Sequence, residues 1–278
     1  SEDRVTPKCK YYSECGGCQY QHIKYEEQLH WKKQQVVELL KHMTGTNSKV
    51  CDVVPSPIHY HYRSKITPHF NKPKNGKIGP IGFQQYGRRS LVDIDSCEIA
   101  KKDINTSLKK IRDDILEKAP SYKKGATILI RSDINDQIHT RSDSIAEEVV
   151  EDIKFHFTAG SFFQNNPFIL NQFTKHVRNE AKSKKSKYLI DAYCGAGLFA
   201  LTSASAFEEV TGIEISESSI FWAKKNLSNN SIDNVKFITG EIEKFFEQVS
   251  YKGNETSIII DPPRKGCSEN FLQQLFVF

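Results

Sequence analysis

Apolar side chains recur at helical spacing in two segments of the first half of the chain. In residues 25–43 the apolar positions that share one helical face are Leu29, Val36, Leu40 and Met43. In residues 101–118 they are Ile104, Leu108, Ile111 and Ile115. Such spacing predicts two amphipathic helices. The polar run TGTNSK ends the first of them.

Residues 50–100 carry a different pattern, rich in proline, glycine, aromatic and β-branched residues. This composition predicts short strands joined by turns. Asn75-Gly76 and Tyr86-Gly87 are expected at hairpin tips. The runs ATILIR, from Ala126, and KFHF, from Lys154, predict further strands.

Beyond about residue 160, apolar strand patterns alternate with helical ones. Strands are expected from Lys187 (KYLIDAY) and in EVTGIEIS, VKFITG and SIIIDPP, and helices at 167–181, 198–207 and 218–229. This alternation is typical of an open parallel sheet covered by helices. We therefore expect a β-rich domain at 1–158 and a Rossmann-like α/β domain at 159–278. The helix at 25–43 is compatible with packing on the second domain.

Composition adds limits to this picture. The 278 residues are 38% hydrophobic, which suffices for two cores, and the net charge is +5. No run of 18 apolar residues occurs, and the opening SEDRVTPK does not resemble a secretion signal. We expect an intracellular, monomeric protein without a membrane span. Seven cysteines are too few for a disulfide scaffold, so clustered ones suggest a metal or a catalytic thiol.

A glycine motif, DAYCGAG, follows the first strand of the second half. Gly195 and Gly197 would let the backbone approach a ligand at the start of a helix. Glu214, 19 residues beyond Gly195, ends the next strand, where a carboxylate can hold both ribose hydroxyls. The third glycine of a dinucleotide fingerprint is missing, which favours S-adenosylmethionine over NAD. A tight turn with a solvated glutamate is the alternative.

Asp261 follows the apolar run SIII in the sequence Asp261-Pro262-Pro263-Arg264. Open α/β sheets bind ligands at the carboxyl ends of their strands. Stiffened by two prolines, this segment could point Asp261 at a flat substrate, although it could also be a plain turn.

Cys9, Cys15 and Cys18 form a C-x5-C-x2-C cluster, and Cys97 follows 79 residues later. Four thiolates can hold a tetrahedral zinc ion or a 4Fe–4S cluster. The five-residue gap exceeds most zinc spacings, which favours iron and sulfur. Reduced cysteines without a metal are the remaining interpretation.

Residues 58–92 contain seven Lys or Arg and no Asp or Glu. Aromatic residues are interleaved with them, a combination that suits phosphates and unstacked bases of RNA. We single out Arg63, Lys65, Arg88 and Arg89 as RNA-binding candidates. A solvated sheet face is the alternative.

The order FFQNN, DAYCGAG, GIEIS and DPPRKG resembles the RNA (uracil-5-)-methyltransferase family, and the cysteine cluster also matches it. The resemblance implies S-adenosylmethionine as methyl donor, bound by Gln164, Tyr193, Glu214 and Asp261. One branch of the family carries a 4Fe–4S cluster on C-x5-C-G-G-C and a distant cysteine. The lysine- and asparagine-rich composition of the sequence is similar to that of the fungal branch, which acts on the T-loop uridine of tRNA.

The resemblance also implies a mechanism in which a cysteine adds to carbon 6 of uracil. Carbon 5 then becomes nucleophilic enough to take a methyl group. The family's nucleophile lies in an S-C-N-P turn, and its general base is a later glutamate. Neither motif occurs up to Phe278, so we expect both beyond it. Cys194 and Cys267 are other thiols in this half, and we interpret both as structural. Cys267, which follows the DPPR loop, is a weak candidate for the nucleophile.

Four functions stay open at this point. The favoured one is methylation of a tRNA uridine. Methylation of ribosomal RNA is the second, since the cysteine cluster is familiar from the bacterial ribosomal branch. A relative that binds RNA without catalysis is the third, and a methyltransferase that acts on another substrate is a weaker fourth.

Overall fold

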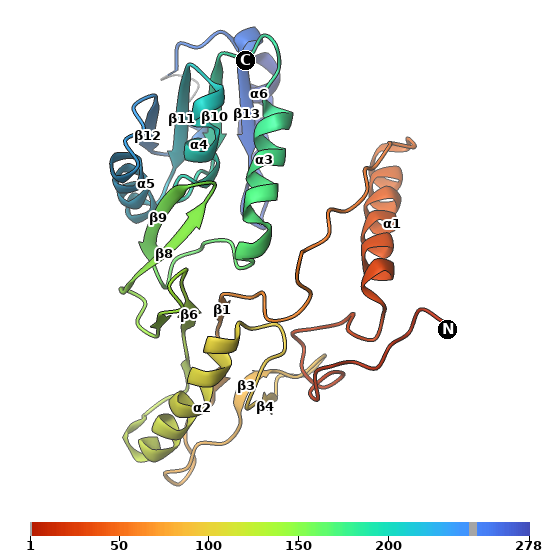
Figure 1. Ribbon diagram of the computed structural model, residues 1–278, viewed down its shortest axis with the longest axis vertical. Coiled ribbons are helices and arrows are strands. Elements are labelled where there is room, and N and C mark those ends of the chain that lie inside the picture. Colours follow the sequence, from red (N-terminus) through yellow and green to blue (C-terminus); the bar gives the residue numbers. More distant parts are fainter. Residues whose placement is uncertain (1, 245–248) are drawn as a thin grey trace. The chain divides into compact units, whose positions relative to one another are not determined.

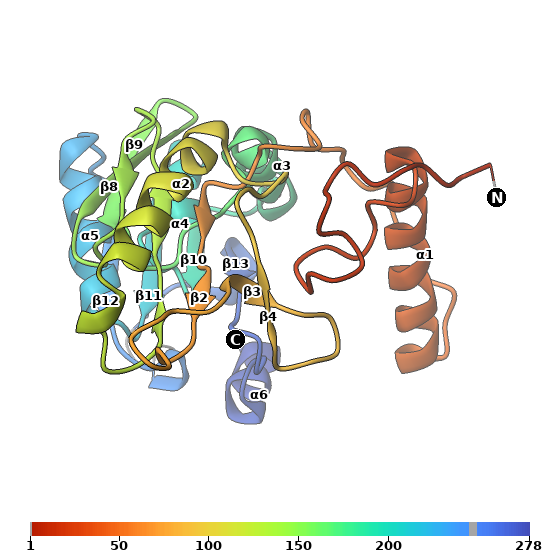
Figure 2. The same cartoon turned by 90° about the horizontal axis from the view of Figure 1, so that it is seen from below.

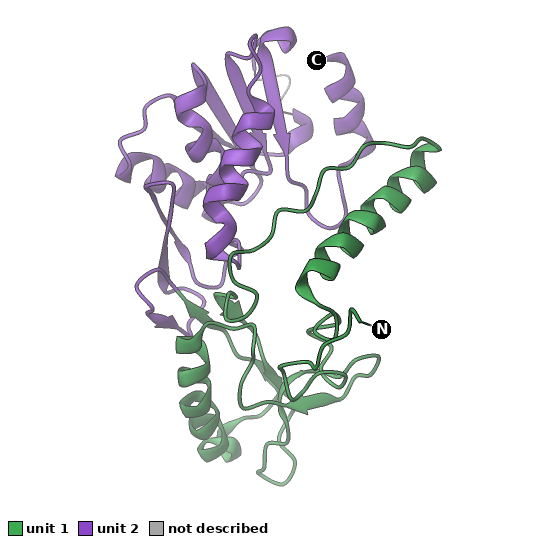
Figure 3. Cartoon of the chain, turned by 45° about the vertical axis from the view of Figure 1, so that its right-hand side comes forward, with its two compact units in different colours: residues 1–132 green, residues 133–278 purple. Residues whose placement is uncertain are grey.

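The computed structural model describes residues 2–244 and 249–278, which fall into two compact units (Figure 3). The first unit ends at Ser132 and the second begins at Asp133. The sequence places this boundary later, near residue 158. The difference arises because the hairpin of β8 (Ile145–Val150) and β9 (Ile153–Thr158) packs on α5 (Glu217–Asn229) of the second unit, as Figures 1 and 2 show. Asn226 of α5 accepts a hydrogen bond from the His156 amide at 2.8 Å and donates one to its carbonyl at 3.1 Å.

The first unit contains an antiparallel sheet of short strands. Its order is β4 (Leu91–Asp93), β3 (Ile81–Gln84), β2 (His69–Phe70) and β5 (Ala126–Thr127). The two expected hairpin tips are confirmed. Asn75 and Gly76 have φ angles of 50° and 72° between mutually hydrogen-bonded Lys74 and Lys77, and Gly87 turns between β3 and β4 with a φ of 68°.

Both predicted helices of this unit form, as α1 (Tyr25–Thr44) and α2 (Lys102–Glu117), and a short 3-10 turn (Ala119–Ser121) follows α2. Their apolar faces differ. α2 buries Ile104, Leu108 and Ile115, and Ile115 packs against Phe70 and Ile81 of the sheet. α1 buries none of its residues, and Met43 is 72% exposed.

The run ATILIR, expected as one strand, forms two. β5 pairs with β2, whereas β6 (Ile130–Ser132) pairs with β1 (Lys65–Ile66), where Lys65 lies opposite Arg131. The chain changes partner between the two strands, so a single alternating pattern cannot continue through the segment.

The second unit is the expected α/β fold. Its sheet has the order β12 (Val235–Thr239), β11 (Glu209–Glu214), β10 (Tyr188–Ala192) and β13 (Thr256–Ile260), and all neighbours are parallel. The remaining elements are β7 (Ile138–His139), α3 (Leu170–Ala181), α4 (Leu198–Ser203), α6 (Glu269–Val277) and short 3-10 turns at Pro167–Ile169, Ala204–Ala206, Ile242–Lys244 and Gly253–Glu255.

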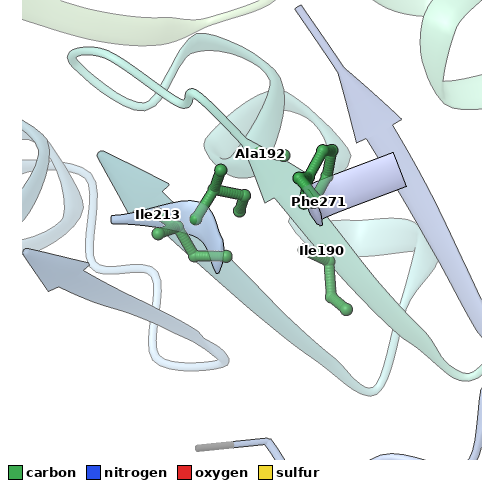
Figure 4. Close-up of a cluster of buried hydrophobic side chains, with 5 residues drawn as sticks. Ile190, Ala192, Ile213 and Phe271 are labelled. Carbon is green, nitrogen blue, oxygen red and sulfur yellow. The ribbon is translucent and has the colours of Figure 1, made fainter. Parts of the chain in front are cut away.

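The core of this sheet lies where α6 meets β10. Ile190 and Ala192 share one face of β10 and pack with Ile213 of β11 and Phe271 of α6 (Figure 4). Because side chains alternate across a strand, Asp191 points to the opposite face, toward α4. No helix within the described residues is both long and apolar enough to cross a membrane.

Candidate functional site

The loop after β10 has an unusual backbone. Tyr193, Gly195 and Gly197 have φ angles of 64°, 54° and 89°, all in the left-handed region. A Cβ on Gly197 would lie 2.8 Å from Cζ of Phe237, whereas one on Gly195 would point into open space. Gly197 is therefore required by packing. Gly195 leaves room beside the backbone, and a loop needs such room if a ligand is to approach its backbone closely.

Glu214 ends β11 and reaches this loop. Its Oε2 accepts a hydrogen bond from the Gly195 amide at 3.2 Å, and its Oε1 accepts one from the Ser216 amide at 2.9 Å. The carboxylate is half-buried and fixed by the backbone, and each oxygen keeps a second lone pair for a ligand. The sequence placed Glu214 and Gly195 in one candidate cofactor site, and the structure brings the two residues together.

Asp191 lies beneath the loop. Its Oδ2 accepts a hydrogen bond from the Ala200 amide at 2.8 Å, and its Oδ1 is buried without a hydrogen-bond partner among the described residues. Burial raises the pKa of Asp191 to about 8, and the negative charges of Asp261 and Glu214 add to the shift. Three carboxyl groups thus gather at this edge, and Asp191 resists ionisation.

Tyr193 and Asp261 leave the sheet at the same edge, because the preceding residues, Ala192 and Ile260, are partners in the parallel pair β10–β13. Asp261 is exposed. Burial and a hydrogen bond with the Cys267 side chain raise the pKa of Tyr193 to about 12. Sequence reasoning did not anticipate the pairing of Tyr193 with Cys267.

The other predicted residues of this half have plainer surroundings. Gln164 is half-buried in the segment between β9 and α3, and its place in the cofactor site stays a prediction. Cys194 is 6% exposed, and burial raises its pKa well above the ordinary range. A buried thiol of this kind is inert, in keeping with the structural interpretation of Cys194.

All four clustered cysteines line one cavity of about 250 Å³ in the first unit. Every one of them is a free thiol. The segment 15–18 is fixed to the sheet, since the Gly16 amide donates to the Gln84 carbonyl at 2.9 Å. A Cβ on Gly16 would lie 3.0 Å from that carbonyl oxygen, so a larger residue would be crowded here.

Asn105 of α2 holds the distant Cys97 in place. Its Oδ1 accepts a hydrogen bond from the Cys97 amide at 2.8 Å, and its Nδ2 donates to the Cys97 carbonyl at 3.0 Å. Sequence reasoning missed Asn105 because a polar residue in a helix carries no signal of such a partner.

Three of the four thiols have raised pKa values. Burial raises the pKa of Cys97 to about 11, and it also raises the pKa values of Cys15 and Cys18. Two groups act in the opposite direction on Cys18, namely the Gln21 amide and the positive charge of Arg63. The described residues contain no group of three or more His, Cys, Asp or Glu side chains placed to hold a single metal ion. The thiols surround a cavity instead.

The four RNA-binding candidates divide into two pairs. Arg63 is half-buried beside the cysteine cavity, and its Nε donates to the Lys65 carbonyl at 3.0 Å. Burial lowers the pKa of Lys65 to about 8, and the charges of Arg131 and Arg63 add to the effect. Arg88 and Arg89 are exposed between β3 and β4. Arg89 lines a separate cavity of about 380 Å³. The other residues that line it include His69, Asn71, Gln84 and Thr127.

Comparison with known proteins decides the family. The sequence pattern of the family described as tRNA (Uracil-5-)-methyltransferase matches residues 121–276, more than half of the chain. The chain belongs to this family. Among its relatives is the tRNA (uracil(54)-C(5))-methyltransferase of Schizosaccharomyces pombe, 42% identical over 100% of this chain and 56% of that protein. The Saccharomyces cerevisiae protein of the same name is 34% identical over 97% of this chain and 53% of its own length. The expected family resemblance is confirmed, and both of these relatives are fungal.

The fold is shared with a solved structure. The Pyrococcus abyssi tRNA (uracil-54, C5)-methyltransferase, crystallised with S-adenosyl-L-homocysteine, matches with a TM-score of 0.69 over 94% of this chain and 73% of that one. At 22% sequence identity the match establishes the mixed α/β fold. The present chain spans about half the length of the two yeast relatives.

Proposed function

We propose that this chain serves in S-adenosylmethionine-dependent methylation of carbon 5 of a uridine in tRNA. The observation that carries the proposal is the Glu214 carboxylate held at the Gly195 loop, on a chain that belongs to the tRNA (uracil-5-)-methyltransferase family. The names of the two yeast relatives support tRNA, and uridine 54 in particular, as the substrate.

The carboxyl edge of the sheet suits the methyl donor. Glu214 would accept hydrogen bonds from the two ribose hydroxyls, and the backbone beside Gly195 and Gly197 would pass close to the cofactor. Tyr193 and Asp261 flank this position from β10 and β13. Gln164 is proposed as a further contact on the resemblance alone. Bound there, the cofactor supplies an electrophilic methyl group.

The chemistry that the family implies begins with a thiolate adding to carbon 6 of uracil. The electron pair of the 5,6 double bond moves toward carbon 5, which would then take the methyl group as the sulfur–methyl bond breaks and S-adenosylhomocysteine leaves. A base removes the proton from carbon 5, and the thiol leaves. Cys194 is too buried for this role. The Cys267 thiol interacts with the Tyr193 side chain, and we assign it to the support of that side chain.

We further propose that Cys9, Cys15, Cys18 and Cys97 hold a 4Fe–4S cluster, with zinc as the second candidate. A multi-atom cluster needs thiols spread around a cavity, and the four cysteines line one of about 250 Å³. The cluster would tie the segment around Cys9 to Cys97 and need take no part in methyl transfer, which is not a redox reaction.

The first unit would bind the RNA. The segment 58–92 has no acidic residue, and Arg88 and Arg89 are exposed on it. These two residues are the better candidates for phosphate contacts, because Arg63 and Lys65 are half-buried. An RNA substrate and reduced thiols are in keeping with an intracellular protein.

The decisive experiment is mass-resolved nucleoside analysis of tRNA and ribosomal RNA from cells that lack this protein. Loss of 5-methyluridine from tRNA, restored by the wild-type gene and not by Glu214→Ala, is the expected result. Loss from ribosomal RNA alone would establish the second substrate. Unchanged 5-methyluridine in both pools, together with RNA binding by the protein, would identify a relative that binds RNA without methylating it.

A further inference from the structure

Gln21 is a buried polar side chain in the wall of the cysteine cavity. It is 8% exposed and lies three residues after Cys18. Its Oε1 accepts a hydrogen bond from the Cys9 amide at 3.1 Å. Its Nε2 is buried and has no hydrogen-bond partner among the described residues.

The orientation of this amide is fixed by its neighbour. A backbone N–H can only donate, so the atom that faces Cys9 must be the oxygen, and the NH2 group must take the other position. A buried amide donor that lacks an acceptor costs about 1–3 kcal/mol. Such a group in a folded protein calls for an explanation.

The cavity supplies a set of possible acceptors for this donor. Gln21 and all four cysteines line it. A thiol accepts hydrogen bonds poorly, whereas a metal-bound thiolate or the sulfide of a cluster accepts them well. The Gly17 amide already points at the Sγ of Cys15, at 3.4 Å.

We propose that the Nε2 of Gln21 donates a hydrogen bond to a sulfur atom of the metal group that the four cysteines hold. Gln21 is thus a positioning residue: one end of its amide fixes the backbone of the first ligand, Cys9, and the other end stabilises charge on the group. The inference rests on the metal site proposed above and adds a residue that the cysteine motif does not specify.

Two substitutions separate this role from a purely structural one. Gln21→Glu keeps an oxygen for the Cys9 amide and removes the N–H donor, while Gln21→Met removes both. A residue needed only to cap Cys9 would tolerate glutamate and not methionine. If Gln21 is the proposed donor, both substitutions weaken the metal site. Gln21→Glu weakens it more, because the glutamate charge faces a sulfur atom.

The experiment uses anaerobically purified full chain and measures release of the bound metal to a chelator. Relative to wild type, Gln21→Met should release metal about ten-fold faster and Gln21→Glu faster still, as expected for loss of an outer partner of a ligand. If the metal is iron, both variants should show a lower reduction potential, since a lost N–H···S bond no longer stabilises the more negative reduced state. Gln19→Met, at an exposed neighbouring position, is the matched control.

The outcomes are distinct. Wild-type rates and potentials in Gln21→Glu, in protein with its full complement of metal, would overturn the role of Gln21 alone. Absence of bound metal from wild-type protein would overturn both this inference and the metal site itself. Thermal unfolding of the metal-free variants distinguishes a weakened metal site from a misfolded one.

Discussion

The carboxyl edge of the β10–β11 pair and the cysteine cavity are both candidate ligand sites, and they are built differently. At the first, the protein's own backbone holds the functional carboxylate, because both oxygens of Glu214 accept amide hydrogen bonds. At the second, the backbone brings the four thiols to one cavity, but burial keeps Cys15, Cys18 and Cys97 from ionising. The Glu214 site is organised in the ligand-free protein, whereas the proposed metal group would complete the cysteine site.

The largest effect is expected at the cysteine cavity. Anaerobically purified protein should contain about four irons per chain, and Cys97→Ser should lose most of them. Because metal binding contributes to folding, the variant should also lose several kcal/mol of unfolding free energy from the first unit. Iron analysis and thermal unfolding measure the two effects. Cys51→Ser, at an exposed cysteine outside the cavity, is the control.

Full iron in Cys97→Ser would remove Cys97 from the ligand set. Stoichiometric zinc in place of iron would support the four cysteines as ligands but would identify the metal as zinc.

The next effect concerns the pre-organised site. Glu214→Ala should weaken binding of S-adenosylhomocysteine by about 1.5–3 kcal/mol, since charge-assisted hydrogen bonds to the ribose are lost. The folded state should change less, because the Gly195 and Ser216 amides lie where water can replace the carboxylate. Isothermal calorimetry measures the affinity, and Glu217→Ala, at the exposed start of α5, is the control. Equal affinity in the two variants would exclude Glu214 from the cofactor site.

Gly195 and Gly197, both in the loop after β10, should respond differently to substitution by alanine. Gly197→Ala should cost about 2 kcal/mol of unfolding free energy, because its left-handed φ of 89° is joined by a clash with Phe237. Gly195→Ala should cost about 1 kcal/mol from its φ of 54° alone. Cofactor affinity should fall in Gly195→Ala, whose methyl group enters the open space beside the loop. Urea unfolding and calorimetry test the pair, and equal destabilisation by both substitutions would contradict the packing argument.

The sequence indicated which residues of each candidate site come together better than it indicated what surrounds them. Residue type and spacing identified Glu214, Gly195 and the four cysteines, and the structure brings each set together. Helical periodicity predicted α1 and α2 alike, yet only α2 buries its apolar face, because periodicity does not say what covers a face. Asn105 and the second end of the Gln21 amide escaped prediction, since both depend on partners set by tertiary structure.

The last expected effect is a pH dependence that arises at the pre-organised site. The pKa of Asp191 is raised to about 8 in the folded protein, against about 3.9 in an unfolded chain. Between these values the folded state binds more protons than the unfolded state, so the contribution of Asp191 to stability falls as pH rises. The expected slope is at most about 1.4 kcal/mol per pH unit. Asp191→Asn should flatten this slope while its side-chain oxygen still accepts from the Ala200 amide. Urea unfolding at several pH values measures it, with Asp233→Asn, at an exposed position, as control. A slope unchanged by Asp191→Asn would mean that Asp191 is ionised in the folded protein. In that case its buried site would tolerate a negative charge.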